Sequence, residues 1–174
     1  VALVGAVNEK AARQALRMIK VDYEVLKPVL DYKTAIDNES VVHMEKDYIN
    51  ARFCNTAPER NILTYGEESN GDVEAEFAAS DLIVEETYEI QAQEQSMMET
   101  FRTYTYLDHN DRLVCVTSTQ VPFHVRRQLS RALGIPQTRI RVVKPRIGGG
   151  FGAKQTVVSE FYPAVVTLKT GRAA

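Results

Sequence analysis

The alternation of apolar and polar residues predicts a β-hairpin near the middle of the chain. Apolar or β-branched residues recur at every second position over 101–107 and again over 112–119, which is the period of a strand. The residues between these runs, 108–111, are Asp, His, Asn and Asp, a composition typical of a turn. We therefore expect two antiparallel strands joined by a short turn.

Helical periodicity follows the hairpin. Over 122–133 the apolar residues share one helical face, and Gly134 fits a left-handed cap at the helix end. The pattern then predicts a strand over 139–144. Beyond a glycine-rich loop it predicts a helix over 156–168 that ends before Gly171.

The first half of the chain shows weaker periodicity. It opens with a predicted β-α-β unit, a strand over 1–7, a helix over 9–20 capped by Asn8 and a strand over 21–26. We further expect a short helical or looped piece over 31–38, a connector over 39–70, an acidic helix over 72–79 capped by Asp72, and a strand over 82–91. Helices and strands mixed in this way predict an α+β fold.

Composition describes a water-soluble globular chain with 44% hydrophobic and 25% charged residues. No apolar run approaches the ~20 residues of a membrane span, so we expect no membrane partner. Cys54 and Cys115 are too few for a disulfide framework, and no Cys or His spacing is typical of a metal site. We expect two small buried thiols and a cytoplasmic, reducing location.

Charge is distributed unevenly along the chain. Residues 112–174 hold 11 basic side chains and one acidic one, Glu160, whereas residues 1–111 are strongly acidic. This asymmetry indicates two faces of one molecule, surfaces that meet other chains, or an anionic ligand near the second half. Nucleic acid is not expected as a partner, because the basic residues are not interleaved with stacking aromatics and no recognition motif is present.

Four glycines interrupted only by Phe151 occupy positions 148–152. Such a run can adopt positive φ angles and turn successive N–H groups toward an anion, and we expect Lys154 to add a positive charge beside it. A tight turn between packed elements is the simpler interpretation. A nucleoside-triphosphate loop is excluded, because Gln155 follows the lysine where Ser or Thr is required.

A dinucleotide-binding loop is a further alternative for 148–152. Gly148, Gly150 and Ala153 formally match the spacing of that motif. The motif also requires an acidic residue about 20 positions later, and the sequence has none there.

Two blocks of residues resemble the molybdenum hydroxylases, the xanthine dehydrogenase and aldehyde oxidase family, in their molybdopterin-binding large subunit. One block runs from Ser118-Thr119-Gln120 through Leu133-Gly134-Ile135-Pro136 to the glycine loop and Lys154. The other is the segment 93–100, Gln-Glu-Gln-Ser-Met-Met-Glu-Thr. The opening β-α-β unit resembles the end of the α/β hammerhead domain of that family.

This resemblance implies a fragment of an enzyme that hydroxylates an N-heterocycle, such as xanthine or hypoxanthine, or an aldehyde, with water. It implies a pterin cofactor whose dithiolene, rather than protein side chains, holds the molybdenum. Iron–sulfur and FAD modules and the remainder of the large subunit would be the partners. The implied domains are a hammerhead end over 1–37, a connector over 38–71 and the first part of the molybdopterin-binding domain over 72–174, with mixed strands and packed helices.

The resemblance also implies roles for individual residues. Gln93 would donate a hydrogen bond to the molybdenum oxo group. Gly149, Gly150, Phe151 and Gly152 would lie against the metal and the pterin.

The substrate side, the general base and Glu99 are separate from these roles. Gln155 would face the substrate, where purine-oxidising members carry a glutamate. The general base of the family matches nothing in this chain. We expect Glu99 to be a structural partner near the hairpin.

Overall fold

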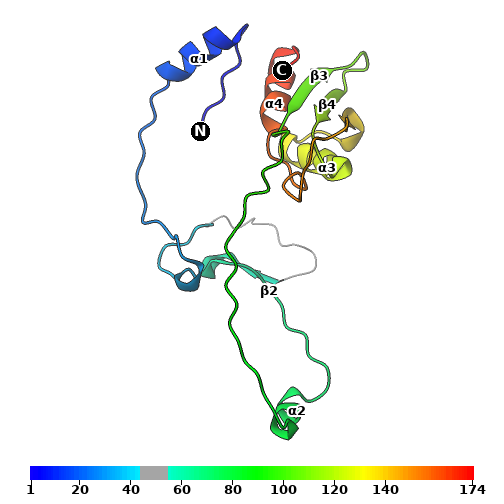
Figure 1. Ribbon diagram of the computed structural model, residues 1–174. Coiled ribbons are helices and arrows are strands. Elements are labelled where there is room, and N and C mark those ends of the chain that lie inside the picture. Colours follow the sequence, from blue (N-terminus) through cyan, green and yellow to red (C-terminus); the bar gives the residue numbers. More distant parts are fainter. Residues whose placement is uncertain (44–54) are drawn as a thin grey trace. The chain divides into compact units, whose positions relative to one another are not determined.

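The computed structural model describes residues 1–43 and 55–174 (Figure 1). They divide into two compact units. The first combines Val1–Lys20 with Ile90–Ala174, and the second is Val21–Glu89.

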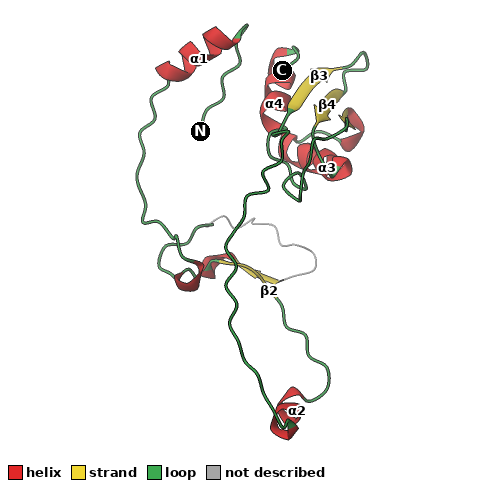
Figure 2. Ribbon diagram, viewed as in Figure 1, coloured by secondary structure: helices red, strands yellow, loops and turns green. Residues whose placement is uncertain are grey.

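A three-stranded sheet is the centre of the first unit, and Figure 2 shows its hairpin in yellow. Strand β3 (Thr103–Leu107) pairs antiparallel with β4 (Leu113–Thr117), which pairs parallel with β5 (Ile140–Val143). The predicted hairpin and the predicted third strand are thus confirmed, with β4 in the middle of the sheet.

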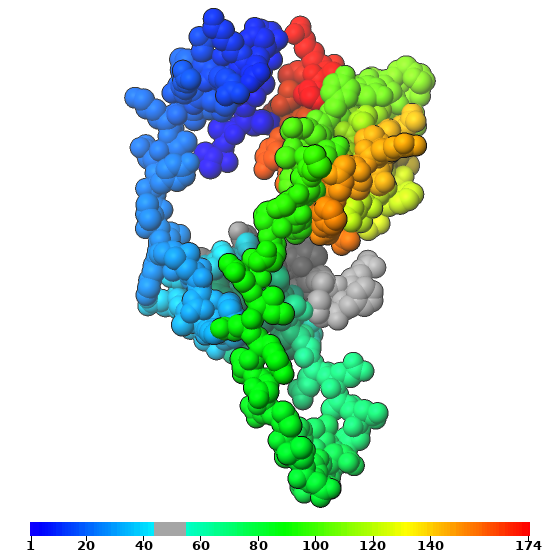
Figure 3. Space-filling view, in the orientation of Figure 1, coloured from blue at the N-terminus to red at the C-terminus, as the bar shows by residue number. Residues whose placement is uncertain are grey.

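Two helices cover this sheet and form the core with it. Helix α3 (Pro122–Leu133) has the predicted bounds, and Gly134 ends it at φ 66°. Helix α4 (Phe161–Thr170) ends at Gly171, as expected. The yellow-green to orange residues of this unit pack against one another in the space-filling view (Figure 3). The buried apolar core consists of Leu113, Cys115, Val125, Leu129, Ile140 and Ala164.

Helix α4 begins five residues later than predicted, and the carboxylate of Glu160 accounts for the difference. Its Oε2 accepts hydrogen bonds from the backbone N–H groups of Val158 and Ser159 at 2.9 and 3.0 Å. Its Oε1 accepts one from the Thr117 hydroxyl at 2.8 Å. Because these bonds hold the chain in a bend before 161, the helix cannot start earlier.

The outer edge of β3 is paired at one position. Thr105 and Ala174 exchange both backbone hydrogen bonds, at 2.7 and 3.0 Å, in the manner of an antiparallel pair. The side chain of Thr105 makes a second link. Its buried hydroxyl lies 2.8 Å from the hydroxyl of Thr167 and joins β3 to α4.

The N-terminal part of the first unit contains helix α1 (Glu9–Met18). The side chain of Asn8 accepts from the N–H of Ala11 at 2.9 Å, so the predicted cap is confirmed. The predicted strands over 1–7, 21–26 and 82–91 are wrong, because none of these stretches forms a strand. A strand requires a hydrogen-bonding partner, and within the described residues these stretches have none.

The second unit is small and largely irregular. Strands β1 (Asn55–Ala57) and β2 (Ile62–Tyr65) form a hairpin around the 3-10 turn η2 (Pro58–Arg60), and η1 (Tyr32–Thr34) precedes them. Helix α2 (Val73–Ala79) has the predicted Asp72 cap. Part of the predicted connector, with Cys54, lies outside the described residues. The domain boundaries expected from the sequence stay a prediction.

No helix in the described parts of the chain is long and apolar enough to cross a membrane.

Candidate functional site

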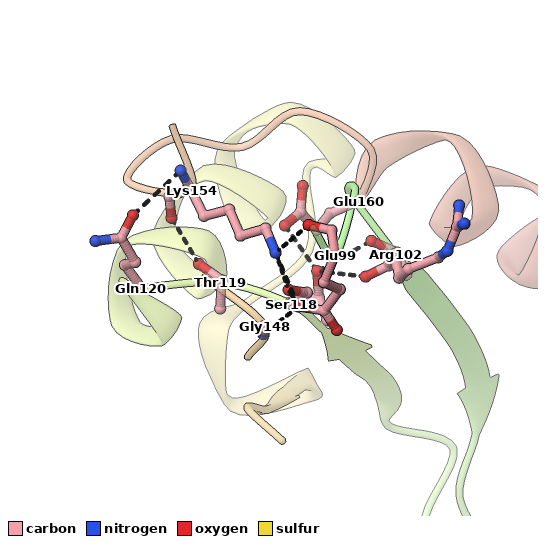
Figure 4. A network of polar contacts seen from close by, with 10 residues as sticks. Glu99, Arg102, Ser118, Thr119, Gln120, Gly148, Lys154 and Glu160 are labelled. Atoms are coloured by element: carbon pink, nitrogen blue, oxygen red, sulfur yellow. Dashed lines mark hydrogen bonds and ion pairs between the residues drawn. The ribbon is translucent and has the colours of Figure 1, made fainter. Parts of the chain in front are cut away.

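The two ends of the glycine loop are held by one carboxylate oxygen. Oε2 of Glu99 accepts hydrogen bonds from the backbone N–H of Gly148 at 2.8 Å and from Nζ of Lys154 at 2.8 Å. It also accepts one from the hydroxyl of Ser118 at 2.6 Å (Figure 4). We call Glu99, Ser118, Gly148 and Lys154 the carboxylate clamp. It joins three segments that are far apart in the sequence.

The Lys154 side chain is fully buried in this clamp. Its Nζ donates not only to the Glu99 carboxylate but also to the Glu99 carbonyl and to the Ser118 Oγ, each at 2.8 Å. A buried ammonium group needs such partners, because desolvation otherwise disfavours its charge. The expectation that Lys154 adds a positive charge beside the loop is therefore wrong, because its buried ammonium group is paired with the Glu99 carboxylate.

The pKa of the Glu99 carboxyl falls from its ordinary value of 4.5 to about 2. The largest cause is the hydrogen bond from Lys154, followed by those from Ser118 and Gly148. Glu99 is therefore ionised at neutral pH and already occupied by donors. This arrangement is that of a structural partner, as expected from the sequence, rather than that of a general base.

A second set of contacts holds the loop from the side of the segment before α3. The Gln120 backbone N–H donates to the Lys154 carbonyl at 2.9 Å, and the Gln120 Oε1 accepts from the Lys154 N–H at 3.2 Å. The Thr119 hydroxyl donates to the same carbonyl at 3.3 Å. Figure 4 shows Thr119 and Gln120 on one side of Lys154 and Glu99 on the other.

Close packing disfavours a side chain at two loop positions. A Cβ on Gly150 would lie 2.6 Å from the Gln120 Oε1, and a Cβ on Gly148 would lie 2.7 Å from the Glu99 Cβ. Real Cβ atoms do not approach other heavy atoms this closely. The loop therefore sits directly on the side chains that anchor it.

The middle of the loop adopts a backbone path suited to an anion. Gly149, Phe151 and Gly152 have φ angles of 93°, 46° and 88°. In the described structure, the backbone N–H groups of the four residues 149–152 donate to no protein acceptor, whereas those of 148, 153, 154 and 155 all do. Consecutive unpaired N–H groups on a fixed loop are donors for a negatively charged ligand.

Phe151 is exposed at the tip of this loop, with 74% of its surface accessible. A left-handed φ is unfavourable for a residue with a side chain, and such strain gathers at functional sites. The exposed ring lies against Gly149, where its Cε2 is 3.1 Å from the position of a Cβ, and so forms an apolar surface beside the free amides.

Two other residues predicted for the site lie outside this set of contacts. The Gln93 side chain is exposed, and within the described residues it has no hydrogen bond. Gln155 is also exposed, with its N–H donating to the Gly152 carbonyl at 3.2 Å. The segment of Gln93 approaches the loop at Met97, whose Cβ would lie 3.3 Å from a Cβ on Gly149. The roles of Gln93 and Gln155 stay predictions.

The described residues contain no group of three or more His, Cys, Asp or Glu side chains that could hold a metal ion. Cys115 is buried in the core, and burial, with a smaller effect of Glu160, raises the pKa of its thiol to about 12. It is therefore a packing residue, as expected, and not a thiolate ligand.

Comparison with known proteins gives a consistent result. The family described as the molybdopterin cofactor-binding domain matches residues 54–174. The chain is 37% identical to the "probable hypoxanthine oxidase XdhD" of Escherichia coli (strain K12), over 99% of this chain and 20% of that protein. It is 35% identical to aldehyde oxidase 2 of Rattus norvegicus, over 99% of this chain and 12% of that protein.

Solved structures show the same fold. Quinoline 2-oxidoreductase from Pseudomonas putida 86 aligns with a TM-score of 0.71 at 22% identity, over 97% of this chain and 20% of that one. The chain thus spans about a fifth of the length of the first relatives that it matches. The comparisons give no support to the dinucleotide-binding alternative.

Proposed function

This chain belongs to the molybdopterin cofactor-binding domain family, and we propose that it forms one wall of the molybdenum site in a larger hydroxylase. The supporting observation is the glycine loop, which presents four consecutive free N–H groups between two ends held by the carboxylate clamp. The loop fits an anionic cofactor, since its N–H donors have no acceptor in the described protein and the exposed Phe151 ring lies beside them.

In this proposal the chain's own residues bind and orient the cofactor. The N–H groups of Gly149, Gly150, Phe151 and Gly152, in a loop with positive φ angles, would donate to its oxygens, and the exposed Phe151 ring would lie on the metal side. The Gln93 amide would donate a further hydrogen bond to the molybdenum oxo group. When bound, the molybdenum–pterin group supplies the redox chemistry that hydroxylates a carbon next to nitrogen or oxygen with water.

Neither Glu99 nor Glu160 takes the substrate proton in the proposed mechanism. The Glu99 carboxylate is committed to three donors, and the buried Glu160 carboxylate holds the bend before α4. The general base therefore belongs to another part of the enzyme. This chain alone binds one side of the cofactor and is inactive.

The proposed substrate is an N-heterocycle, such as xanthine or hypoxanthine, or an aldehyde. Relatives named hypoxanthine oxidase and aldehyde oxidase support both classes. Gln155 is proposed to lie on the substrate side. Its amide offers a hydrogen bond but no charge, which favours a neutral heterocycle or an aldehyde.

We place the enzyme in the cytoplasm, with iron–sulfur and FAD modules and the remainder of the large subunit as partners. Residues 1–37 are proposed as the end of an α/β hammerhead domain, 38–71 as a connector and 72–174 as the start of the molybdopterin-binding domain. In this arrangement the exposed apolar residues of 1–7 and 21–26 pack against strands outside this chain.

The test is the molybdenum and pterin content of the full-length enzyme purified from a molybdenum-replete host. We expect molybdenum in the unaltered enzyme, a strong loss in Gly150→Val, and a lower turnover or content in Gln93→Ala. Gly66→Val is the matched control, because a Cβ at Gly66 meets nothing within 4 Å. An unaltered enzyme free of molybdenum, or full activity in both site variants, would contradict the proposal.

A further inference from the structure

We propose that a basic pocket at the start of α3 binds a small ligand that carries a phosphate or diphosphate group. The pocket lies between the first turn of α3 and strand β5 and encloses about 430 Å³. Its charged and aromatic lining consists of Arg112, Phe123, Arg126, Arg141 and Lys144. No residue of the carboxylate clamp or the glycine loop lines it, so the proposal is separate from the molybdenum site.

Most of the charge of this pocket is uncompensated. Among the described residues, no acidic side chain lines the pocket, and Arg112 alone of its cations has an ion-pair partner, Asp108, at 2.9 Å. Arg126, Arg141 and Lys144 form no ion pair within the described residues. Several like charges around one hollow repel one another and raise the local potential, which attracts an anion.

Arg126 gives a more specific indication. Its Nε is buried and has no hydrogen-bond partner in the described structure. Its guanidinium carbon lies 5.6 Å from the centre of the Phe123 ring, so stacking on the aromatic face holds the group in place. Because the Nε has almost no accessible surface, an anion in the pocket would meet the Nη groups of Arg126, which have no hydrogen-bond partner among the described residues.

The first turn of α3 adds to the positive electrostatic potential of the pocket. The helix begins at Pro122, which lines the pocket, and no side chain caps its N-terminus. The positive end of the helix therefore lies beside the pocket. Guanidinium groups, an ammonium group and free helix amides together are the donors that phosphate prefers.

The shape favours a small anion over a polymer. The volume lies within the roughly 300–1,000 Å³ range of small-molecule pockets. A nucleic acid would instead need a basic track with aromatics along it, and here a single ring, Phe123, is stacked on Arg126. An acidic protein segment is the competing occupant, and the experiment separates the two.

The test is calorimetric titration of the protein with inorganic pyrophosphate at 0.15 M NaCl. We expect saturable 1:1 binding that Arg126→Gln and Lys144→Gln each weaken roughly tenfold. Arg131→Gln is the matched control, because it removes the same charge from an exposed position on the same helix, outside the pocket. It should change the affinity less than about twofold, since salt screens an exposed charge at that distance.

Circular dichroism of each variant verifies that it is folded. Lys144 is exposed, so its substitution tests the pocket even where Arg126→Gln loses structure. Absence of pyrophosphate binding, or equal weakening by all three substitutions, would overturn the proposal. Binding of hexaglutamate in place of pyrophosphate would overturn it in favour of an acidic protein partner.

Discussion

The glycine loop and the segment 90–96 carry the residues proposed to reach one cofactor, yet the chain holds them in opposite ways. The loop is attached at Gly148 and Lys154 to a single oxygen of Glu99 and again to Gln120. The residues of 90–96 are all exposed, and within the described residues they form no hydrogen bond. Backbone donors are thus positioned by the chain itself, whereas we infer that the Gln93 side chain is positioned by the group that it binds.

Removal of the Lys154 ammonium should have the largest effect on the loop. In Lys154→Met the Glu99 carboxylate and the Ser118 hydroxyl lose a buried partner, and we expect a loss of about 3 kcal/mol in the free energy of unfolding. Urea denaturation of the chain measures it. Lys169→Met, an exposed lysine on α4, is the control and should be near neutral. Equal stability of the two variants would show that the clamp does not hold the loop.

A methyl group on Gly150 should have the next largest effect. In Gly150→Ala the new Cβ would lie 2.6 Å from the Gln120 Oε1, so the Gln120 side chain or the loop must shift. Overpacking of this kind costs about 2 kcal/mol. Gly66→Ala meets nothing within 4 Å and serves as the control in the same denaturation experiment. A neutral Gly150→Ala would mean that the Gln120 side chain does not hold the loop in place.

Acid should weaken the loop through Glu99. The folded-state pKa of this carboxyl, about 2, lies below its ordinary value of 4.5, so the unfolded chain binds the proton more readily. The stabilisation is complete above about pH 4.5 and is lost as the pH falls toward 2. The free energy of unfolding of the unaltered chain should therefore fall more steeply over this window than that of Glu99→Gln. Parallel curves would rule out the low pKa.

The smallest effect on folding is expected at Gln93. Because its side chain is exposed, Gln93→Ala should change the free energy of unfolding by no more than about 0.5 kcal/mol. The same substitution should still lower turnover or cofactor content in the full-length enzyme. A large loss of stability would mean that the chain itself fixes Gln93, and the contrast with the glycine loop would disappear.

The sequence predicted those features that interactions between residues close in the sequence determine. The hairpin, helix α3 with its Gly134 cap and helix α2 with its Asp72 cap all depend on neighbouring residues. The strands expected over 1–7 and 21–26 failed because alternation marks an apolar face but supplies no partner strand. Pairing is a long-range property that a single stretch does not encode.

Within the site, the sequence identified the loop but not its support. The glycines within 148–152 allow the backbone positive φ angles, and the positive φ angles of Gly149 and Gly152 agree with that expectation. The bond between Lys154 and Glu99 spans 55 positions, and no local pattern distinguishes a buried lysine from an exposed one. The spacing of six residues between Gly148 and Lys154 matters because both residues bond the same Glu99 oxygen, and the sequence alone does not show this.

Since Gly148 and Lys154 both donate to the Oε2 of Glu99, the loop is a closed ring whose circumference is set by covalent geometry. Its span cannot widen or narrow without breaking one of these bonds. Inside the ring, the Gly150 carbonyl accepts the Ala153 N–H at 2.8 Å, so the peptide plane that carries the Phe151 N–H is held as well. The loop therefore presents its free N–H groups in directions that the protein sets before any ligand arrives.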